Sequence, residues 1–292
     1  PCRLLKRDVR PPCCTTYLGH WDSSNLRSLL RATAAAGKRP AGLAFGNELA
    51  GSHGIEAHLP PEEYAHDVLA LRSIMDELWP SKSPLLLAPD SAFDSQWVEA
   101  FLHSLLNSSE HKITVRSGPT ANRHAHHGLD HTDHLEPEPE HEAGQRGKTS
   151  LDMLSYHVYP LGAGDGERML SKSLDYRKLD ATIEKLKLAF RVVNTSSAGT
   201  VAPVVSETGG AYNSGRSGLT DSFASGFWFN DLFAALARHG HAFGCRQAIL
   251  GGHYALVNLR DRQLAPDFYS MLLWRRLMSP KVPPVAPRSF VQ

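Results

Sequence analysis

Hydrophobic residues in this chain alternate between short runs and longer stretches with helical spacing. Five apolar runs predict strands, and each is followed by a segment in which apolar residues recur every three or four positions. The strands are expected at 42–45, 84–89, 151–160, 202–207 and 245–252, and the helices at 60–79, 95–106, 179–193, 220–240 and 266–278. Such an alternation is typical of parallel sheets with helical crossovers. The pattern therefore predicts an α/β fold.

The helix expected at 220–240 also carries end signals. Thr220 or Asp221 is a suitable N-terminal cap, and Gly240 is a suitable stop.

Composition restricts the class of protein. The 292 residues include 31 basic and 30 acidic side chains, and the formal net charge is +1. A neutral balance of this kind gives no field that would attract nucleic acid. No apolar stretch is long enough for a membrane span, and the four cysteines have no metal-ligand spacing. We expect no nucleic-acid partner, no transmembrane segment, no metal and no cofactor; peripheral association with membranes stays open.

One segment interrupts the regular pattern. Residues 117–150 are polar, rich in His, Glu and Pro, and lack apolar periodicity. This composition predicts a disordered insertion. Its histidines could chelate a metal such as zinc, but their irregular spacing favours a solvated spacer. The domain division expected is a poorly defined segment at 1–20, the main domain at 21–280, and a tail or linker at 281–292.

Two glutamates follow predicted strands directly. Glu48 follows the run at 42–45, and Glu207 ends the run at 202–207. In a βα barrel the carboxyl ends of the strands carry the active site. Two carboxylates there are what a glycosidase needs, whereas a single one would more often be an ordinary loop or helix-start acid. The spacing alone indicates a possible glycosidase.

Several motifs resemble the heparanase-like proteins of glycoside hydrolase family 79, especially the plant-type branch. The resemblance covers residues from about 20 to about 280, with the motifs in the family's order. They are GLAFGNELAG (42–51), LLLAPDSAFDSQW (85–97), SYHVYPLGAG (155–164), the SETGGAYNSG block within 204–240, CRQAILGGHYALVN (245–258) and PDFYSMLLWRRLM (266–278).

The resemblance implies a retaining β-glucuronidase. Glu48 falls on the family's acid/base and Glu207 on its nucleophile, which together cleave β-linked glucuronic acid from polysaccharide, proteoglycan or small glucuronides. Asn47 would bind a sugar hydroxyl near the anomeric centre. Another retaining glycosidase of the same barrel clan is a weaker alternative, because the SETGGAYNSG block points to family 79.

The same resemblance implies a set of substrate-binding residues around the two glutamates. The loop after Tyr212 would hold the glucuronate carboxylate through backbone N–H groups, which suit an anion. Tyr156 departs from the pattern, since relatives often carry a second histidine there. The set is His157, Tyr159, Tyr212, Asn213, Ser214, Gly215, Gln247 and Tyr254.

The family fold is a (β/α)8 barrel, of which this chain is expected to contain only part. The acid follows the fourth strand in the family, so the run at 42–45 corresponds to strand four. A helix at 21–37, capped by Asp22 or Ser23, precedes it. Three further strand–helix units would need roughly 90 residues, which is more than the segment before residue 42 contains. We therefore expect an incomplete barrel with strands four to eight, strands one to three missing or degenerate, and a truncated C-terminal β-sandwich.

The expected incompleteness keeps a second class of function open. Catalysis depends on tight positioning of both carboxylates. The alternative is a catalytically inactive fragment, or a carbohydrate-binding relic of the same family.

The expected location rests on weaker signals. No signal peptide precedes the first motif, but N-glycosylation acceptor sequences begin at Asn107 and Asn194. Together with the family resemblance they favour the secretory route, with the protein extracellular or in a lysosome or vacuole.

Overall fold

The computed structural model describes residues 15–16, 21–50, 57–114 and 150–278. The expected N-terminal segment at 1–20, apart from residues 15–16, lies outside the described residues. The same holds for the tail at 281–292 and for all but the last residue of the insertion expected at 117–150.

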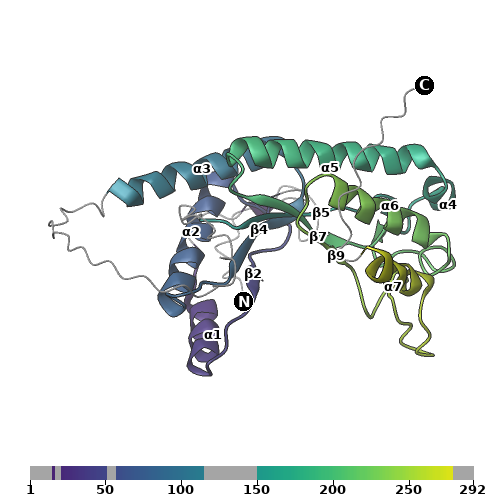
Figure 1. The fold of residues 1–292 in the computed structure, drawn as a ribbon, viewed down its shortest axis with the longest axis horizontal. Helices are drawn as coiled ribbons and strands as arrows, with labels where there is room; N and C mark the ends of the chain where they lie inside the picture. The colour runs from purple at the N-terminus through teal and green to yellow at the C-terminus, as the bar shows by residue number, and fades with distance from the viewer. Residues whose placement is uncertain (1–14, 17–20, 51–56, 115–149, 279–292) are drawn as a thin grey trace, which may run out of the picture.

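The described chain alternates strands and helices (Figure 1). The strands are β1 (Thr15–Thr16), β2 (Gly42–Ala44), β3 (Ala57–His58), β4 (Leu85–Ala92), β5 (Met153–His157), β6 (Gly162–Ala163), β7 (Ala202–Thr208), β8 (Ala211–Tyr212) and β9 (Gly244–Arg246). The helices are α1 (Ser24–Ala35), α2 (Pro61–Leu78), α3 (Ser95–Thr114), α4 (Met169–Ser173), α5 (Tyr176–Ser196), α6 (Ser225–Arg238) and α7 (Pro266–Leu277).

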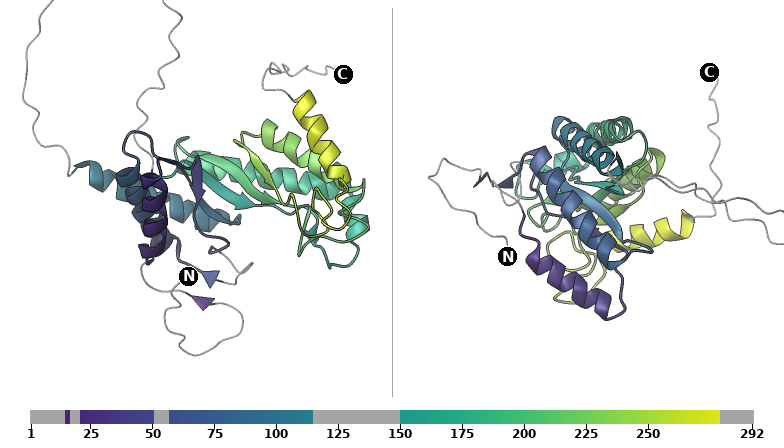
Figure 2. Two further views of the ribbon diagram at one scale, coloured as in Figure 1. Left: turned by 90° about the horizontal axis from the view of Figure 1, so that it is seen from below. Right: turned by 90° about the vertical axis from the view of Figure 1, so that its left-hand side faces the viewer.

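A five-stranded parallel sheet forms the centre of the molecule. Its order is β2-β4-β5-β7-β9, so the strands are neighbours in the order in which they occur along the chain. Helices α2, α3, α5 and α6 pack each against the next and lie around the curved sheet (Figure 2). Strands in sequential order with helical crossovers on the outside form part of a (β/α)8 barrel. The expected fold class is confirmed.

Most predicted elements are confirmed, and two need correction. β9 ends at Arg246 instead of near residue 252, and Ile249 is 68% exposed. Gly251 and Gly252, which follow, have positive φ angles, as is typical of a turn. The apolar run thus belongs to a surface loop.

Helix α6 begins later than its end signals suggest. Its N-cap is Ala224, with no side-chain cap bond. Thr220 does not cap it: its hydroxyl oxygen accepts the Arg216 N–H, and its single proton faces the carbonyl oxygens of Arg216 and His253, each 2.9 Å away. At the other end, Gly240 follows the C-cap with a φ of +74°, as predicted.

Of the two candidate caps of α1, one occupies the N-cap position and the other makes the hydrogen bond. Ser23 occupies the N-cap position but makes no cap bond with its side chain. The carboxylate of Asp22 accepts a hydrogen bond from the backbone N–H of Ser24 at 3.1 Å.

Buried aromatic side chains anchor the turn after β2. Tyr64 on α2 is fully buried and stacks on Phe45 with ring centroids 5.6 Å apart. Its hydroxyl donates a hydrogen bond to the Phe45 carbonyl. The first turn beyond the strand, which leads to Glu48, is thereby fixed to the helical layer.

A buried ion pair joins β9 to α7. Arg246 lies 2.8 Å from Asp267, and their side chains are 1% and 2% exposed. Arg246 also donates to the Tyr254 carbonyl and lies over the ring of Trp228. Removing one partner of such a buried pair leaves the other charge without compensation, and this destabilises the fold.

Asp267→Ala is expected to lower the free energy of unfolding by about 3 kcal/mol, because Arg246 would remain buried without its counter-charge. This is the lower end of the usual range, since Arg246 keeps its bond to Tyr254. Urea denaturation measures the change, with Asp180→Ala on the exposed surface of α5 as the control. Equal midpoints for the two variants would contradict the prediction.

A second buried polar contact concerns Tyr156. This side chain is 1% exposed, packs against Phe93, and hydrogen-bonds Nε2 of His241 at 2.6 Å. Burial lowers the pKa of His241 to about 4. Tyr156 is therefore part of the core.

Stability is expected to fall as the pH decreases from 6.5 to 4. An unfolded histidine binds a proton near pH 6.5, whereas folded His241 stays neutral down to about pH 4. In this window the unfolded state binds more protons, so acid favours unfolding. The wild type should lose about 2 kcal/mol more than His241→Gln between pH 7 and pH 4.5. Parallel losses in urea denaturation would rule out His241 as the cause.

Candidate active site

Glu48 lies in the turn beyond the carboxyl end of β2. Its backbone N–H donates to the Asp90 carbonyl at 2.8 Å, which ties the turn to β4. Its φ of +56° is in the left-handed region, which is uncommon for residues other than glycine. Such conformations cluster at functional sites. The side chain is 18% exposed.

Glu207 lies near the end of β7, beside His157 on β5. The two residues are partners in the parallel register of these strands, so their side chains share one face. The Glu207 carboxylate accepts a hydrogen bond from the Tyr159 hydroxyl at 2.6 Å. The same hydroxyl contacts the side-chain amide of Gln247. These contacts orient Glu207 while leaving it 30% exposed.

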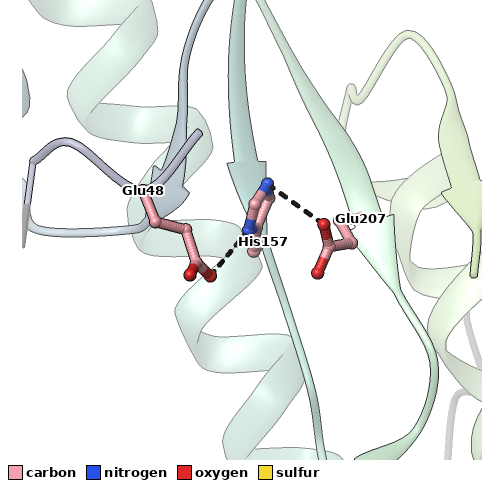
Figure 3. A group of neighbouring side chains, drawn as sticks. All are labelled: Glu48, His157 and Glu207. Atoms are coloured by element: carbon pink, nitrogen blue, oxygen red, sulfur yellow. Dashed lines mark hydrogen bonds and ion pairs between the residues drawn. The ribbon is translucent and has the colours of Figure 1, made fainter. Parts of the chain in front are cut away.

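His157 stands between the two glutamates (Figure 3). Its Nδ1 is 3.0 Å from Glu48 Oε1, and its Nε2 is 3.8 Å from Glu207 Oε2. The ring is 4% exposed. One imidazole thus links the side chains from β2 and β7 across the sheet.

The electrostatics of the cluster favour a charged histidine. Burial pushes the pKa of His157 down, but contacts with Asp90, Glu207 and Glu48 outweigh it, and the net pKa is raised. The pKa of Tyr159 is also raised, first by burial and then by its bond to Glu207. Tyr159 therefore remains a hydrogen-bond donor throughout the neutral and acidic range.

The two glutamates are close enough to act on one bond. Glu48, His157 and Glu207 each offer one nitrogen or oxygen atom, and these three atoms lie within 4.8 Å of one another. Two carboxylates at this separation can attack and protonate the same glycosidic linkage.

The remaining predicted residues differ in how closely they contact this cluster. Tyr159 packs edge-on against Tyr212, whose ring is 43% exposed. Tyr254 is 8% exposed, and its pKa is raised by burial and then by the charge of Glu207. Gln247 joins the cluster through Tyr159. Asn47 is exposed at the edge of the β2 turn.

The loop after β8 has an unusual backbone. Asn213, Ser214 and Gly215 have φ angles of +57°, +66° and +71° in succession. Gly215 is required here, because a side chain would meet Thr220 Oγ1 at 2.4 Å. The Asn213 side chain contacts Asp165 at 3.4 Å and is exposed.

Asp90 is a member of the cluster that the sequence reasoning did not select. It belongs to LAPDS, near the carboxyl end of β4. Its carboxylate is 3.7 Å from His157 Nε2. A polar residue at the carboxyl end of a parallel strand was the available signal.

A groove elsewhere on the molecule has different surroundings. It has a volume of about 690 Å³ and lies between α3 and α5, with Glu99, His103 and Arg191 among its lining residues. None of the lining residues belongs to the glutamate cluster.

The fold and the site together define the chain as part of a glycosidase-type barrel, with two glutamates at the C-terminal ends of its parallel strands. The family model for the N-terminal domain of glycosyl hydrolase family 79 matches residues 9–136 and 141–234, which is more than half of the chain. The chain belongs to this family.

Curated relatives agree with this assignment. The chain is 29% identical to heparanase-like protein 3 of Arabidopsis thaliana over 266 residues, which cover 90% of the chain and 41% of that protein. It is 29% identical to the baicalin-β-D-glucuronidase of Scutellaria baicalensis, covering 92% and 43% of the two chains. Rat (Rattus norvegicus) heparanase is 32% identical over 47% of the chain and 25% of its own length. The chain spans about two fifths of the length of the two plant relatives.

Solved structures support the barrel. A 4-O-α-L-rhamnosyl-β-D-glucuronidase from Fusarium oxysporum superposes with a TM-score of 0.53 and 14% identity, covering 85% of this chain and 47% of that one. A monomeric β-xylosidase from Caulobacter crescentus gives 0.53 and 13%, covering 86% and 46%. At these identities the likeness concerns the fold alone.

Among the described helices, none combines the length and apolar character of a membrane-spanning segment.

Proposed function

We propose that this chain carries the catalytic pair of a retaining β-glucuronidase that cleaves β-linked glucuronic acid. The observation that carries the proposal is the separation of Glu48 and Glu207, whose carboxylate oxygens lie within 4.8 Å of each other. Retaining glycosidases have carboxyl groups about 5–5.5 Å apart, while inverting enzymes leave about 6.5–9.5 Å for a water molecule. The short separation supports retention.

The proposed reaction is a double displacement. Glu207 attacks the anomeric carbon, and the bond to the leaving oxygen breaks as Glu48 gives that oxygen its proton. Glu48, now a carboxylate, removes a proton from water, and the resulting hydroxide displaces Glu207 from the sugar. The enzyme returns to its starting state, and the sugar keeps its β configuration.

Substrate selection follows from the loop after β8. Backbone N–H groups in a tight turn form concave sites for anions. Asn213, Ser214 and Gly215 are therefore proposed to hold the glucuronate carboxylate. Tyr212 and Tyr254 border the sugar, and Asn47 donates to a hydroxyl. The heparanase and glucuronidase names of the relatives support a substrate of this class.

The location proposed for the protein is the secretory route. The support comes from the acceptor sequences at Asn107 and Asn194, both of which are exposed in the structure.

A second candidate is carbohydrate binding without hydrolysis. The observation in its favour is the free edge of β2, because among the described residues no strand pairs with the side of β2 that faces away from β4. A loosely held β2 would let the Glu48 turn move, and a small displacement of a catalytic group can cost about 100-fold in rate.

Hydrolysis of 4-nitrophenyl β-glucuronide at mildly acidic pH, followed by proton NMR, tests the proposal. We expect the β-anomer of glucuronic acid to form first. The β-xyloside and α-arabinoside analogues serve as controls for the sugar. Faster cleavage of either would contradict glucuronate selection, first formation of the α-anomer would contradict retention, and binding with no turnover would favour the second candidate.

A further inference from the structure

Asp90 occupies a distinctive backbone position at the end of β4. The parallel register between β4 and β5 shifts between Pro89 and Ser91, so Asp90 itself has no partner on β5. Its φ is +57°. A bulge of this kind turns one side chain away from the regular alternation of the strand. Here it directs the Asp90 carboxylate toward His157.

The backbone N–H and carbonyl of Asp90 both form hydrogen bonds. Its N–H donates to Ser155 Oγ at 3.1 Å, and its carbonyl accepts from the Glu48 N–H at 2.8 Å. The residue therefore joins the β2 turn to β5 at the level of the two glutamates.

The side chain faces one nitrogen of His157. Asp90 Oδ1 lies 3.7 Å from Nε2, while Nδ1 of the same ring is 3.0 Å from Glu48. The Asp90 side chain is 16% exposed, and within the described part of the chain Oδ1 has no partner at hydrogen-bond distance. Asp90 and Glu207 are almost equally distant from Nε2, at 3.7 and 3.8 Å.

While Glu48 is ionised, this geometry favours a protonated ring. A neutral imidazole has a lone pair on one nitrogen, and that lone pair would then face a carboxylate. An imidazolium donates to Glu48 from Nδ1 and points its Nε2–H toward Asp90 and Glu207, which lie 3.7 and 3.8 Å away. The groups that face His157 are carboxylates from three elements: Glu48 beyond β2, Asp90 on β4 and Glu207 on β7. The other titratable neighbours of these carboxylates are Tyr159, Tyr254, Tyr64 and Cys245.

We propose that Asp90 is a positioning residue: it holds His157 as an imidazolium between Glu48 and Glu207, and through that ring it fixes the orientation of the acid/base carboxyl. In this role Asp90 acts through His157 and not directly on the reacting atoms. This role rests on the proposed function, because a fixed cation beside Glu207 keeps the nucleophile ionised. The contacts of His157 with Asp90 are also among the causes that raise its pKa.

Asp90→Asn is the informative variant. Asparagine has the same size as aspartate and tolerates a positive φ better than most residues, so the bulge is expected to persist. The matched control is Asp180→Asn, which removes the same charge from the exposed surface of α5. Neither the control residue nor its neighbours belong to the site.

The first readout needs no turnover. In protein labelled with ¹⁵N-histidine, long-range proton–nitrogen NMR reports whether each ring nitrogen carries a proton, and His157→Gln identifies the signals of His157. We expect both nitrogens of His157 to be protonated at pH 7 in the wild type and in Asp180→Asn. In Asp90→Asn the pKa of His157 should fall by about one unit, because an opposite charge within 4–6 Å typically contributes one unit or more.

The second readout is the pH dependence of kcat/KM on 4-nitrophenyl β-glucuronide. The basic limb is expected to move to lower pH in Asp90→Asn by about the same amount, and to stay in place in Asp180→Asn.

The outcomes separate the two proposals. A neutral His157 in the wild type at pH 7 overturns the role of Asp90, and so does an unchanged His157 pKa in Asp90→Asn. A shifted pKa with no glucuronide hydrolysis by the wild type overturns the proposed function while the contact between Asp90 and His157 stands. If Asp90→Asn shifts the pKa of His157 but leaves the pH profile of kcat/KM unchanged, the positioning role of Asp90 is overturned even though the enzyme is active.

Discussion

Glu207→Gln is expected to lower kcat for 4-nitrophenyl β-glucuronide by on the order of 10⁴-fold. Glutamine has the shape of glutamate and can keep the contact with Tyr159, so the fold and sugar binding should persist. The amide cannot form the covalent bond to the anomeric carbon, and the first displacement is lost. Steady-state kinetics measure the loss.

A control and a chemical trap make this result specific. Glu99→Gln changes an exposed carboxylate on α3 that lies in the groove between α3 and α5, and it should keep full activity. A 2-deoxy-2-fluoro-β-glucuronyl fluoride should label the wild type at Glu207, since fluorine slows release of the covalent intermediate. Labelling of another carboxylate, or less than a tenfold loss in Glu207→Gln, would refute the nucleophile assignment.

The order of strands and helices could be predicted from the apolar pattern because each buried strand and each amphipathic helix leaves its own periodicity. Helix α2, for example, was expected at 60–79 and spans Pro61–Leu78. The pattern failed where an apolar run is not buried. Ile249 is hydrophobic but exposed, because the chain leaves the sheet after Arg246. Periodicity carries no information on such a departure.

The site residues that could be predicted are those that directly follow a predicted strand. Glu48 and Glu207 were selected because the carboxyl ends of parallel strands meet at one edge, and the structure brings them together through His157. Asp90 also lies near the end of a strand, but the orientation of its side chain depends on a bulge, and a bulge leaves no periodicity in the sequence.

Charge patterns were a poorer guide than strand ends. An arginine near the end of a strand gives no sign of its surroundings, yet Arg246 is buried against Asp267. The two residues are 21 positions apart, and no local periodicity connects a β9 arginine to the first turn of α7. Contacts of this range follow from the packing of the complete fold.

Glu48→Gln is expected to affect substrates according to their leaving group. For an alkyl or sugar leaving group, which needs a proton as the bond breaks, the rate should fall by about 10³-fold. For 4-nitrophenolate, which leaves readily as an anion, the first displacement should be nearly unaffected. The second displacement slows for every substrate, because water loses its general base.

Azide distinguishes this loss from simple misfolding. As an anion it attacks the glucuronyl intermediate without a base, so it should restore turnover of the 4-nitrophenyl substrate in Glu48→Gln and yield β-glucuronyl azide. The wild type and Glu99→Gln should gain nothing. Equal losses for both leaving groups, with no product from azide, would contradict the acid/base role of Glu48. The turn that ties its backbone to Asp90 would then serve the structure alone.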